Sequence, residues 1–423
     1  MKYKKINFFN HLEAKYSNLI VPDTGPLPLT FTLISRKNLM FRLVRFRNHF
    51  AEFIFLGLKT SLKVSWLIYC YLDNRIPIGI MKDRFQREFT KIKFSTLKDE
   101  EVIRLCYLLS LYGLNSFSIE IRKMIFLNFK NSGYYMYGSD KVGRRNRESI
   151  LFCKIDPEQL DLILPDEPLS INFYNDVILN NKKNFNKRIL THQTSNGLLE
   201  AKTMLTGKRV AIVGPGQSTK MQGFEIDQFD TIIRFNASEL PALKRKYIGS
   251  RTDISFENYT TERTVEKYFS KSISHSKLIW SQLKVEFPIK FPTLFQEDFT
   301  NLLWLNGSPF GVLRALLEVL PFEPSKIKVF NSDFGLNSKT YDSSYDNSFA
   351  PTGLPWALWY WAGVGGHDFL INFVALKHMF KSGYFEADET LRQILEMEIS
   401  DFANRLDALF YEKIEKSELF NSI

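Results

Sequence analysis

The hydrophobic pattern of the chain changes near residue 200. Between about residues 36 and 130, apolar residues recur three or four positions apart, which predicts helices. From about residue 207, short β-branched runs alternate with helical stretches, and this alternation predicts a parallel α/β sheet. We therefore expect a mainly helical domain over residues 1–200 and an α/β domain with a C-terminal helix over residues 201–423.

Each expected strand of the second domain is short and ends at a polar or glycine-containing break. The strands are expected at 208–213, 231–235, 252–256, 277–280, 302–305 and 326–330. A helix is expected over 309–320, with Pro309 in its first turn. A last helix over 391–409 has an apolar stripe, which we expect to pack on its own domain in preference to a second subunit.

The chain carries a net charge of +10, and the excess lies entirely in its first half. Residues 1–200 contain 31 Lys and Arg against 19 Asp and Glu, whereas residues 201–423 contain 25 against 27. Such an asymmetry favours an anionic partner for the first half, either a membrane surface or a polyanion. A basic surface that only faces solvent is the alternative.

The most apolar stretch of the first domain, residues 53–72, has about the ~20 residues needed to cross a bilayer. Lys59 and Lys63 interrupt it, and a lysine at mid-bilayer costs roughly 2.5–3.5 kcal/mol. We expect a buried helix or one that lies on an anionic membrane surface. The three cysteines form no C-x-x-C pair, which favours a reducing compartment. The expected location is the cytoplasm, with peripheral attachment to the inner face of the cell membrane.

The strongest local signal is a glycine turn, Gly214-Pro215-Gly216, which follows the first expected strand. A glycine-rich turn between a strand and a helix presents backbone N–H groups to an anion such as phosphate, and Ser218 adds a hydroxyl. The dinucleotide fingerprint is incomplete, because Thr219 stands at the position of its third glycine and no acid ends the second strand. We therefore expect nucleotide binding without NAD, the alternative being a tight turn with no ligand.

Several segments of the second domain resemble, in their order and spacing, the motifs of sialyltransferases, both the animal-type enzymes and the small bacterial ones. The segments are 210–218, 226–236, 247–253, 308–317 and 327–334. A lone histidine, His367, lies in a Gly-Gly-His-Asp sequence where these families have a catalytic histidine. The resemblance covers roughly residues 205–385 and leaves the first 200 residues unassigned.

The resemblance implies a variant Rossmann-like sheet and a metal-independent, inverting reaction. In that reaction a sialic-acid-type sugar moves from a CMP-activated donor to a glycan or lipid-linked glycan, as in polysaccharide biosynthesis. His367 is the implied base, since an imidazole with an ordinary pKa of about 6.5 is largely neutral at neutral pH. Tyr341 and Tyr345 are implied to donate hydrogen bonds to the leaving phosphate. Gly335 replaces the first tyrosine of the pair found in the bacterial enzymes.

The same resemblance assigns the donor-binding residues. They are Gly214, Gly216, Ser218, Asn236, Asn258, Ser308, Gly311 and Tyr345. The amide side chains of asparagine can bind cytosine edges and ribose hydroxyls without adding charge. No Asp-x-Asp sequence occurs in residues 201–423, so we expect neither a metal ion nor another cofactor. We also expect no nucleic acid partner.

Several of these residues also have purely structural interpretations. His367 could lie in a solvent-facing loop, and Tyr341 and Tyr345 could cap their own polar loop. Arg234 could form an ion pair with Asp230 or Asp253 instead of a donor carboxylate. Two other functional classes stay open: a nucleotide-binding α/β enzyme of another class, and a non-catalytic polyanion-binding protein, whose affinity would fall steeply with salt.

Overall fold

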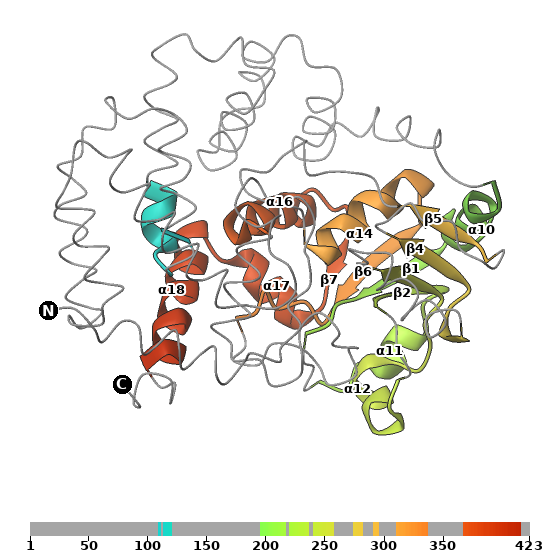
Figure 1. Ribbon diagram of the computed structural model, residues 1–423, viewed down its shortest axis with the longest axis horizontal. Helices are drawn as coiled ribbons and strands as arrows, with labels where there is room; N and C mark the ends of the chain where they lie inside the picture. The colour runs from blue at the N-terminus through green and yellow to red at the C-terminus, as the bar shows by residue number, and fades with distance from the viewer. Residues whose placement is uncertain are drawn as a thin grey trace, which may run out of the picture. The chain divides into compact units, whose positions relative to one another are not determined.

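A computed structural model shows a parallel β-sheet flanked by helices in the second half of the chain (Figure 1). It describes residues 109–110, 113–120, 195–216, 220–236, 240–257, 274–281, 291–295, 310–336 and 367–415. The chain divides into two units. One is Lys154–Phe402, which contains the sheet, and the other is Met1–Cys153 together with Ala403–Ile423.

Seven strands of the described residues form one sheet, in the order β5-β4-β3-β2-β1-β6-β7. They are β1 (Arg209–Val213), β2 (Thr231–Phe235), β3 (Ile254–Glu257), β4 (Leu278–Ser281), β5 (Thr293–Phe295), β6 (Lys326–Phe330) and β7 (Glu386–Ala387). Every neighbouring pair is parallel. The predicted α/β class is therefore confirmed for this part of the chain.

The central strands are apolar on both faces, as expected for a sheet covered on both sides. In β1 the side chains from Val210 to Val213 are all buried. Ala211 and Val213 pack in a cluster with Ile226 and Phe229, on the side where α11 lies. β5 and β7, which the hydrophobic pattern did not predict, have three and two residues and are too short to give a periodic signal.

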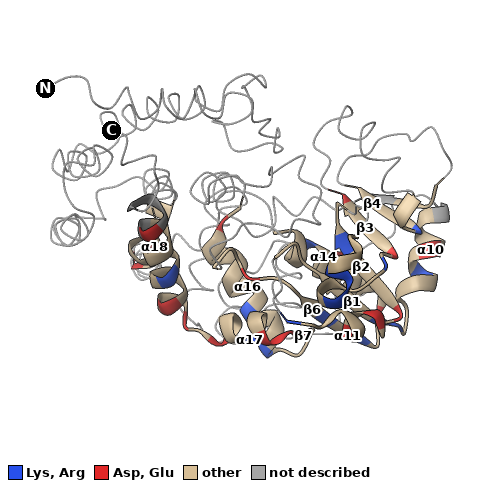
Figure 2. Ribbon diagram, turned by 90° about the horizontal axis from the view of Figure 1, so that it is seen from below, with Lys and Arg blue, Asp and Glu red and all other residues tan. Residues whose placement is uncertain are grey.

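Helices lie on both faces of the sheet, and β1 lies between α14 and α11 in both views (Figure 1, Figure 2). The described helices of the sheet unit are α10 (Ser195–Leu205), α11 (Gly223–Asp227), α12 (Arg245–Ile248), α14 (Gly311–Val319), α16 (Phe369–Lys381) and α17 (Glu389–Glu396). A further helix, α18 (Ile399–Glu415), begins in this unit and continues into the other one. Two 3-10 turns are η5 (Ala242–Lys244) and η6 (Leu320–Phe322). Helix α10 spans the predicted domain boundary at residue 200 and contacts β4 and β5.

The strand order reverses between β1 and β6. From β1 the chain adds β2 to β5 on one side, and then returns to place β6 on the other side of β1. In open parallel sheets, a ligand binds outside the carboxyl ends of the strands at such a switch point. The glycine turn after β1 and the residues after β6 lie at this position.

The single last helix predicted over 391–409 is corrected to two helices, α17 and α18. Met397 separates them, because its extended backbone (ψ 149°) cannot continue a helix. The amino group of Lys377 on α16 donates a hydrogen bond to the carbonyl of Met397 and lies 3.5 Å from Glu398. The break is thus accompanied by a contact with another helix, which the periodic pattern of the segment does not contain.

In the other unit, a carboxylate of α18 caps a helical turn far away in the sequence. Asp407 is buried, and its oxygens accept hydrogen bonds from the backbone amides of Asn115 and Ser116 at 2.7 and 3.0 Å. The side chains of the same two residues donate to it at 2.9 and 2.7 Å. These donors begin the helical residues 115–120, so Asp407 acts as their N-terminal cap.

Candidate functional site

The two glycines of the turn bring the end of β1 against the end of β6. The amide of Gly214 donates to the carbonyl of Phe330 at 2.8 Å, and the amide of Gly216 donates to the carbonyl of Asn331 at 2.9 Å. A Cβ on either glycine would lie 2.5–2.6 Å from that oxygen of Asn331. The glycines are thus required for close backbone approach. Their two amides already have protein partners, so an anion bound at this turn would need other donors.

Three polar side chains join the elements around the switch point. Asp388, the residue before α17, accepts hydrogen bonds from the amide of Asn331 at 2.8 Å and from the amide of Leu391 at 2.9 Å. The side-chain amide of Gln222, which precedes α11, donates to Asn331 Oδ1 at 2.6 Å and to Asp388 Oδ2 at 3.1 Å. β6, α11 and α17 are therefore held together by one buried carboxylate.

In this arrangement, the side-chain NH₂ group of Asn331 is not used by the network. An ionised carboxylate only accepts, so Asp388 orients the NH₂ group of Gln222 toward itself and toward Asn331 Oδ1. Within the described residues, Asn331 Nδ2 has no hydrogen-bond partner, although the residue is only 5% exposed. Buried donors are normally satisfied, so a ligand or an ordered water is the expected partner of this group.

Residues directly after β2 and β6 have left-handed backbone conformations. Asn236 (φ 46°) continues the hydrogen-bond ladder through its amide, which donates to the carbonyl of Phe256 at 2.8 Å. Asn331 (φ 54°) and Phe334 (φ 53°) follow β6. The conformation is uncommon for asparagine and a clear outlier for phenylalanine. Such backbone strain is often found at functional sites. Three of the four described non-glycine residues with positive φ lie at or after the carboxyl ends of β2 and β6, and the fourth, Glu323 (φ 54°), ends η6 before β6.

His367 lies immediately before α16, and its ring packs against Phe310 with the ring centroids 4.9 Å apart. Asp368 caps α16 by accepting a hydrogen bond from the amide of Ile371 at 3.2 Å. Asn372, fully buried in α16, accepts from the amide of Phe310 at 2.7 Å and donates to the carbonyl of Asp368 at 2.8 Å. The side chain of Asn372 therefore holds the start of α14 beside the histidine.

The start of α14 also contacts the ends of β2 and the segment after β6. The rings of Phe310 and Phe334 lie 5.8 Å apart. A Cβ on Gly311 would lie 3.1 Å from the ring of Phe235, the last residue of β2. Through these contacts, His367 and Gly311 lie at the same edge of the sheet as the glycine turn.

A charged group, Asp333, lies beside the glycine turn. Its carboxyl carbon is 3.5 Å from the position of a Cβ on Gly216. The side chain is buried and accepts a hydrogen bond from the amide of Gly335 at 2.9 Å. A carboxylate held in this way can accept hydrogen bonds from hydroxyl groups of a ligand.

Of the predicted site residues, the structure describes five and brings them to the carboxyl edge of the sheet: Gly214, Gly216, Asn236, Gly311 and His367. The other five lie outside the described residues: Ser218, Asn258, Ser308, Tyr341 and Tyr345. The apolar stretch 53–72 and the predicted strand 302–305 also lie outside them.

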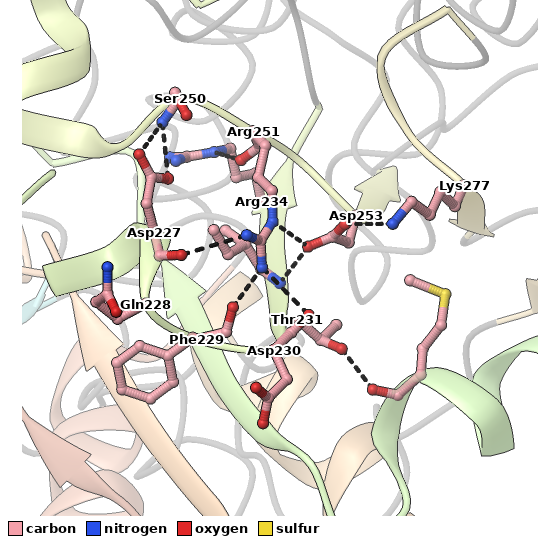
Figure 3. A network of polar contacts seen from close by, with 12 residues as sticks. Asp227, Gln228, Phe229, Asp230, Thr231, Arg234, Ser250, Arg251, Asp253 and Lys277 are labelled. Atoms are coloured by element: carbon pink, nitrogen blue, oxygen red, sulfur yellow. Dashed lines mark hydrogen bonds and ion pairs between the residues drawn. The ribbon is translucent and has the colours of Figure 1, made fainter. Parts of the chain in front are cut away.

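Arg234 has a structural role in β2 (Figure 3). Its guanidinium donates hydrogen bonds to the carbonyls of Ile248 and, at 3.2 Å, of Arg251. Burial lowers the pKa of Arg234 to about 10, and the charges of Asp227 and Asp253 oppose that shift. The side chain remains protonated at neutral pH. Of the two acids proposed as partners of Arg234, Asp253 acts on it through its charge, which raises the pKa of the guanidinium, whereas Asp230 forms an ion pair with Arg209 at 3.0 Å.

The segment that contains Gly249, Ser250 and Arg251 also supports the sheet. Asp253 Oδ2 accepts from the amide of Ile232 at 2.9 Å and from Arg251 Nε at 3.0 Å, and Asp253 Oδ1 lies 3.1 Å from Lys277 Nζ. The amide of Ser250 donates to both carboxylate oxygens of Asp227, at 2.9 and 3.0 Å. This part of the sequence motif therefore fixes the connections between β2, β3 and α12.

Sequence reasoning missed the residues that position the site: Gln222, Asn331, Phe310, Asn372 and Asp388. Two of them carry a recognisable signal. Asn372 interrupts an otherwise apolar helix, and a polar residue there requires a hydrogen-bond partner. Asp388 precedes a helix with an apolar stripe, which is a typical N-cap signal. Each of these two side chains also has partners 57–166 residues away, and no local pattern identifies those distant partners.

Comparison with known proteins gives no family assignment, because no family model matches the sequence and no curated protein matches it significantly. Among the described residues, no group of three or more His, Cys, Asp or Glu side chains could hold a metal ion. In the same part of the chain, no helix is both long enough and apolar enough to span a bilayer.

Proposed function

We propose that the protein is a glycosyltransferase that moves a sialic-acid-type sugar from a CMP-activated donor to a glycan acceptor. The single observation that supports this best is the position of His367. Its ring packs on Phe310, which contacts Phe334 after β6, so the imidazole lies at the strand ends beside the switch point. A nucleotide bound at that position, as is usual for such sheets, would have a general base next to it.

The proposed chemistry is a direct displacement at the sugar. His367 accepts the proton of the acceptor hydroxyl as the oxygen attacks the anomeric carbon, and the bond from that carbon to the phosphate oxygen of CMP breaks. CMP leaves with the electron pair of that bond, and the configuration at the anomeric carbon inverts. Tyr341 and Tyr345 are the proposed donors to the departing phosphate.

The structure changes which groups we propose as donor contacts. Because the amides of Gly214 and Gly216 bind the carbonyls of Phe330 and Asn331, the two glycines are proposed to shape the turn beside the nucleotide and not to donate hydrogen bonds to it. Asn331 Nδ2, which has no hydrogen-bond partner within the described residues, is proposed as an additional donor, and the buried carboxylate of Asp333 beside Gly216 is proposed as an acceptor for hydroxyl groups. Ser218, Asn236, Asn258, Ser308 and Gly311 remain proposed donor-binding residues.

A nucleotide-binding screen tests the proposal directly. Calorimetry of the full-length protein with CMP, CDP, UDP and NAD, each with and without EDTA, should show binding of CMP that EDTA does not change. This expectation follows from the sialyltransferase resemblance and from the absence of Asp-x-Asp in residues 201–423. A clear preference for UDP with Mn²⁺, or for NAD, would overturn the proposal in favour of another nucleotide-dependent enzyme. Binding of none of the four would favour a non-catalytic protein.

A further inference from the structure

An exposed apolar surface lies where α11 meets η5 and α12. Three of the four exposed large apolar side chains in the described part of the chain are here: Met221 is 75% exposed, Phe224 80% and Leu243 86%. Single exposed apolar residues are common, but a group of three large ones marks a site of interaction. We call these three residues the α11–α12 surface.

The two segments form one surface because their backbones touch. A Cβ on Gly223 would lie 1.9 Å from the carbonyl oxygen of Arg245 and 2.9 Å from the amide nitrogen of Gly249. Met221 comes two residues before Gly223 and Phe224 directly after it, and Leu243 comes two residues before Arg245. Figure 1 shows α11 and α12 side by side, away from the helices on the other face of the sheet.

Cationic side chains surround the three apolar ones. Lys220, Arg245 and Lys246 are exposed, and Lys244 is half-buried. The ammonium group of Lys246 lies 4.9 Å from the centroid of the Tyr247 ring. The surface thus alternates large apolar groups with positive charge along two short stretches of chain.

The two acidic side chains of α11 have protein partners. Glu225 forms an ion pair with Lys328 of β6. Asp227 accepts two hydrogen bonds from the amide of Ser250. Both carboxylates are therefore engaged with protein groups, and Lys220 also interacts with Glu389 of α17. Arg245 and Lys246 are the exposed cations that α12 contributes to the α11–α12 surface.

The position of the surface relates it to the site. α11 follows the glycine turn at the carboxyl end of β1, and η5 and α12 follow the carboxyl end of β2. The candidate site lies at the carboxyl ends of the same strands. A partner bound to the α11–α12 surface would therefore lie next to the carboxyl edge of the sheet.

We propose that the α11–α12 surface docks on an anionic lipid membrane. Apolar side chains interleaved with Lys and Arg suit the interface of a bilayer, where the apolar groups enter the acyl boundary and the cations meet lipid phosphates. This surface belongs to the sheet-containing unit and is separate from the basic first 200 residues. The proposal does not depend on the reaction, although it would bring the site edge to a lipid-linked acceptor.

Vesicle co-sedimentation of the full-length protein tests the docking surface. Phosphatidylcholine vesicles with and without phosphatidylglycerol are compared, in the absence of nucleotide. The triple variant Met221→Ser/Phe224→Ser/Leu243→Ser should lose on the order of tenfold in partitioning to the anionic vesicles. The double variant Arg245→Gln/Lys246→Gln should lose about fivefold for each cation removed, and added salt should reduce the difference.

Leu199→Ser is the matched control, because Leu199 is also exposed (68%) but lies on α10, before the amino end of β1. It should bind vesicles as the wild type does. Wild-type binding by both the triple and the double variant would overturn the proposal, as would an equal loss in Leu199→Ser. A loss of self-association in the variants with unchanged vesicle binding would also overturn it, in favour of a protein partner. The charge variant keeps the test valid if the triple variant fails to fold.

Discussion

At the scale of single residues, the position of the histidine depends on Asn372. This side chain is fully buried in an apolar helix, and both polar atoms of its amide are used: Oδ1 accepts from the amide of Phe310, and Nδ2 donates to the carbonyl of Asp368. Because Phe310 is the residue on which the His367 ring packs, the asparagine fixes the distance between the start of α14 and the start of α16. His367 is thereby held at the sheet edge by packing and by a cap.

Substituting His367 tests its proposed role as a general base. His367→Ala should lower turnover of a CMP-sugar by ~10²–10⁴, because the acceptor hydroxyl loses its proton acceptor. The affinity for CMP, measured by calorimetry, should change little, since the imidazole acts on the acceptor. His275→Ala is the control, because His275 is exposed and lies before β4, at the opposite edge of the sheet. Full activity of His367→Ala would exclude the histidine from the mechanism.

At the scale of elements, one carboxylate connects three of them. Asp388 caps α17 through the amide of Leu391, binds the amide of Asn331 after β6, and receives the side-chain amide of Gln222 before α11. The network also orients the side chain of Asn331, whose Nδ2 is left unpaired within the described residues. Stability and the arrangement of the switch point therefore depend on the same group.

Removing this carboxylate should be strongly destabilising. Asp388→Ala should lower the free energy of unfolding by about 2–4 kcal/mol, because the cap of α17 is lost and the buried amide of Asn331 is left without an acceptor. Urea unfolding measures the change. Glu389→Gln is the matched control: Glu389 pairs with Arg392 at the surface, and such pairs contribute about 0–1 kcal/mol. Equal effects of the two substitutions would contradict the connecting role of Asp388.

At the scale of the whole molecule, each unit uses contacts between distant parts of the chain. In the sheet unit, β1 lies between β2 and β6, although β6 begins more than ninety residues after the end of β2. In the other unit, Asp407 of α18 caps residues 115–120 across a separation of 292 and 291 residues. Residues from both ends of the chain are therefore required for that unit.

The stability of the unit that contains Asp407 should depend on pH. Burial raises the pKa of the Asp407 carboxyl, although the hydrogen bonds from Ser116 and Asn115 oppose the shift. The folded state then binds the proton more tightly than the unfolded state. The stabilisation that follows from this difference is complete below the ordinary pKa of about 3.9, and it is lost as the pH rises through the pKa of Asp407 in the folded state.

Urea unfolding measured from about pH 4 upward should therefore show that the free energy of unfolding of the wild type falls as the pH rises. The fall should be weaker in Asp407→Asn, whose side chain does not titrate. Glu412→Gln, a change at an exposed position of the same helix, should follow the wild-type profile. A steeper decline in Asp407→Asn than in the wild type would contradict the raised pKa.

The sequence by itself determined the α/β class of the second half, the positions of its longer strands and the glycine turn. This was possible because β-branched runs and glycines act locally: the runs expected near β1, β2 and β6 match strands within one residue at each end. The elements without such local signals were missed, namely the short edge strands β5 and β7 and the break at Met397.

Only the tertiary structure decided how the residues of the candidate site are used. The amides of Gly214 and Gly216 bind the end of β6, and Asn372 joins two helix starts that are 62 residues apart. The partners in these contacts come from strands and helices that are adjacent only in the folded chain. Burial of a polar group creates the requirement for a partner, and the strand order determines which partner is within reach.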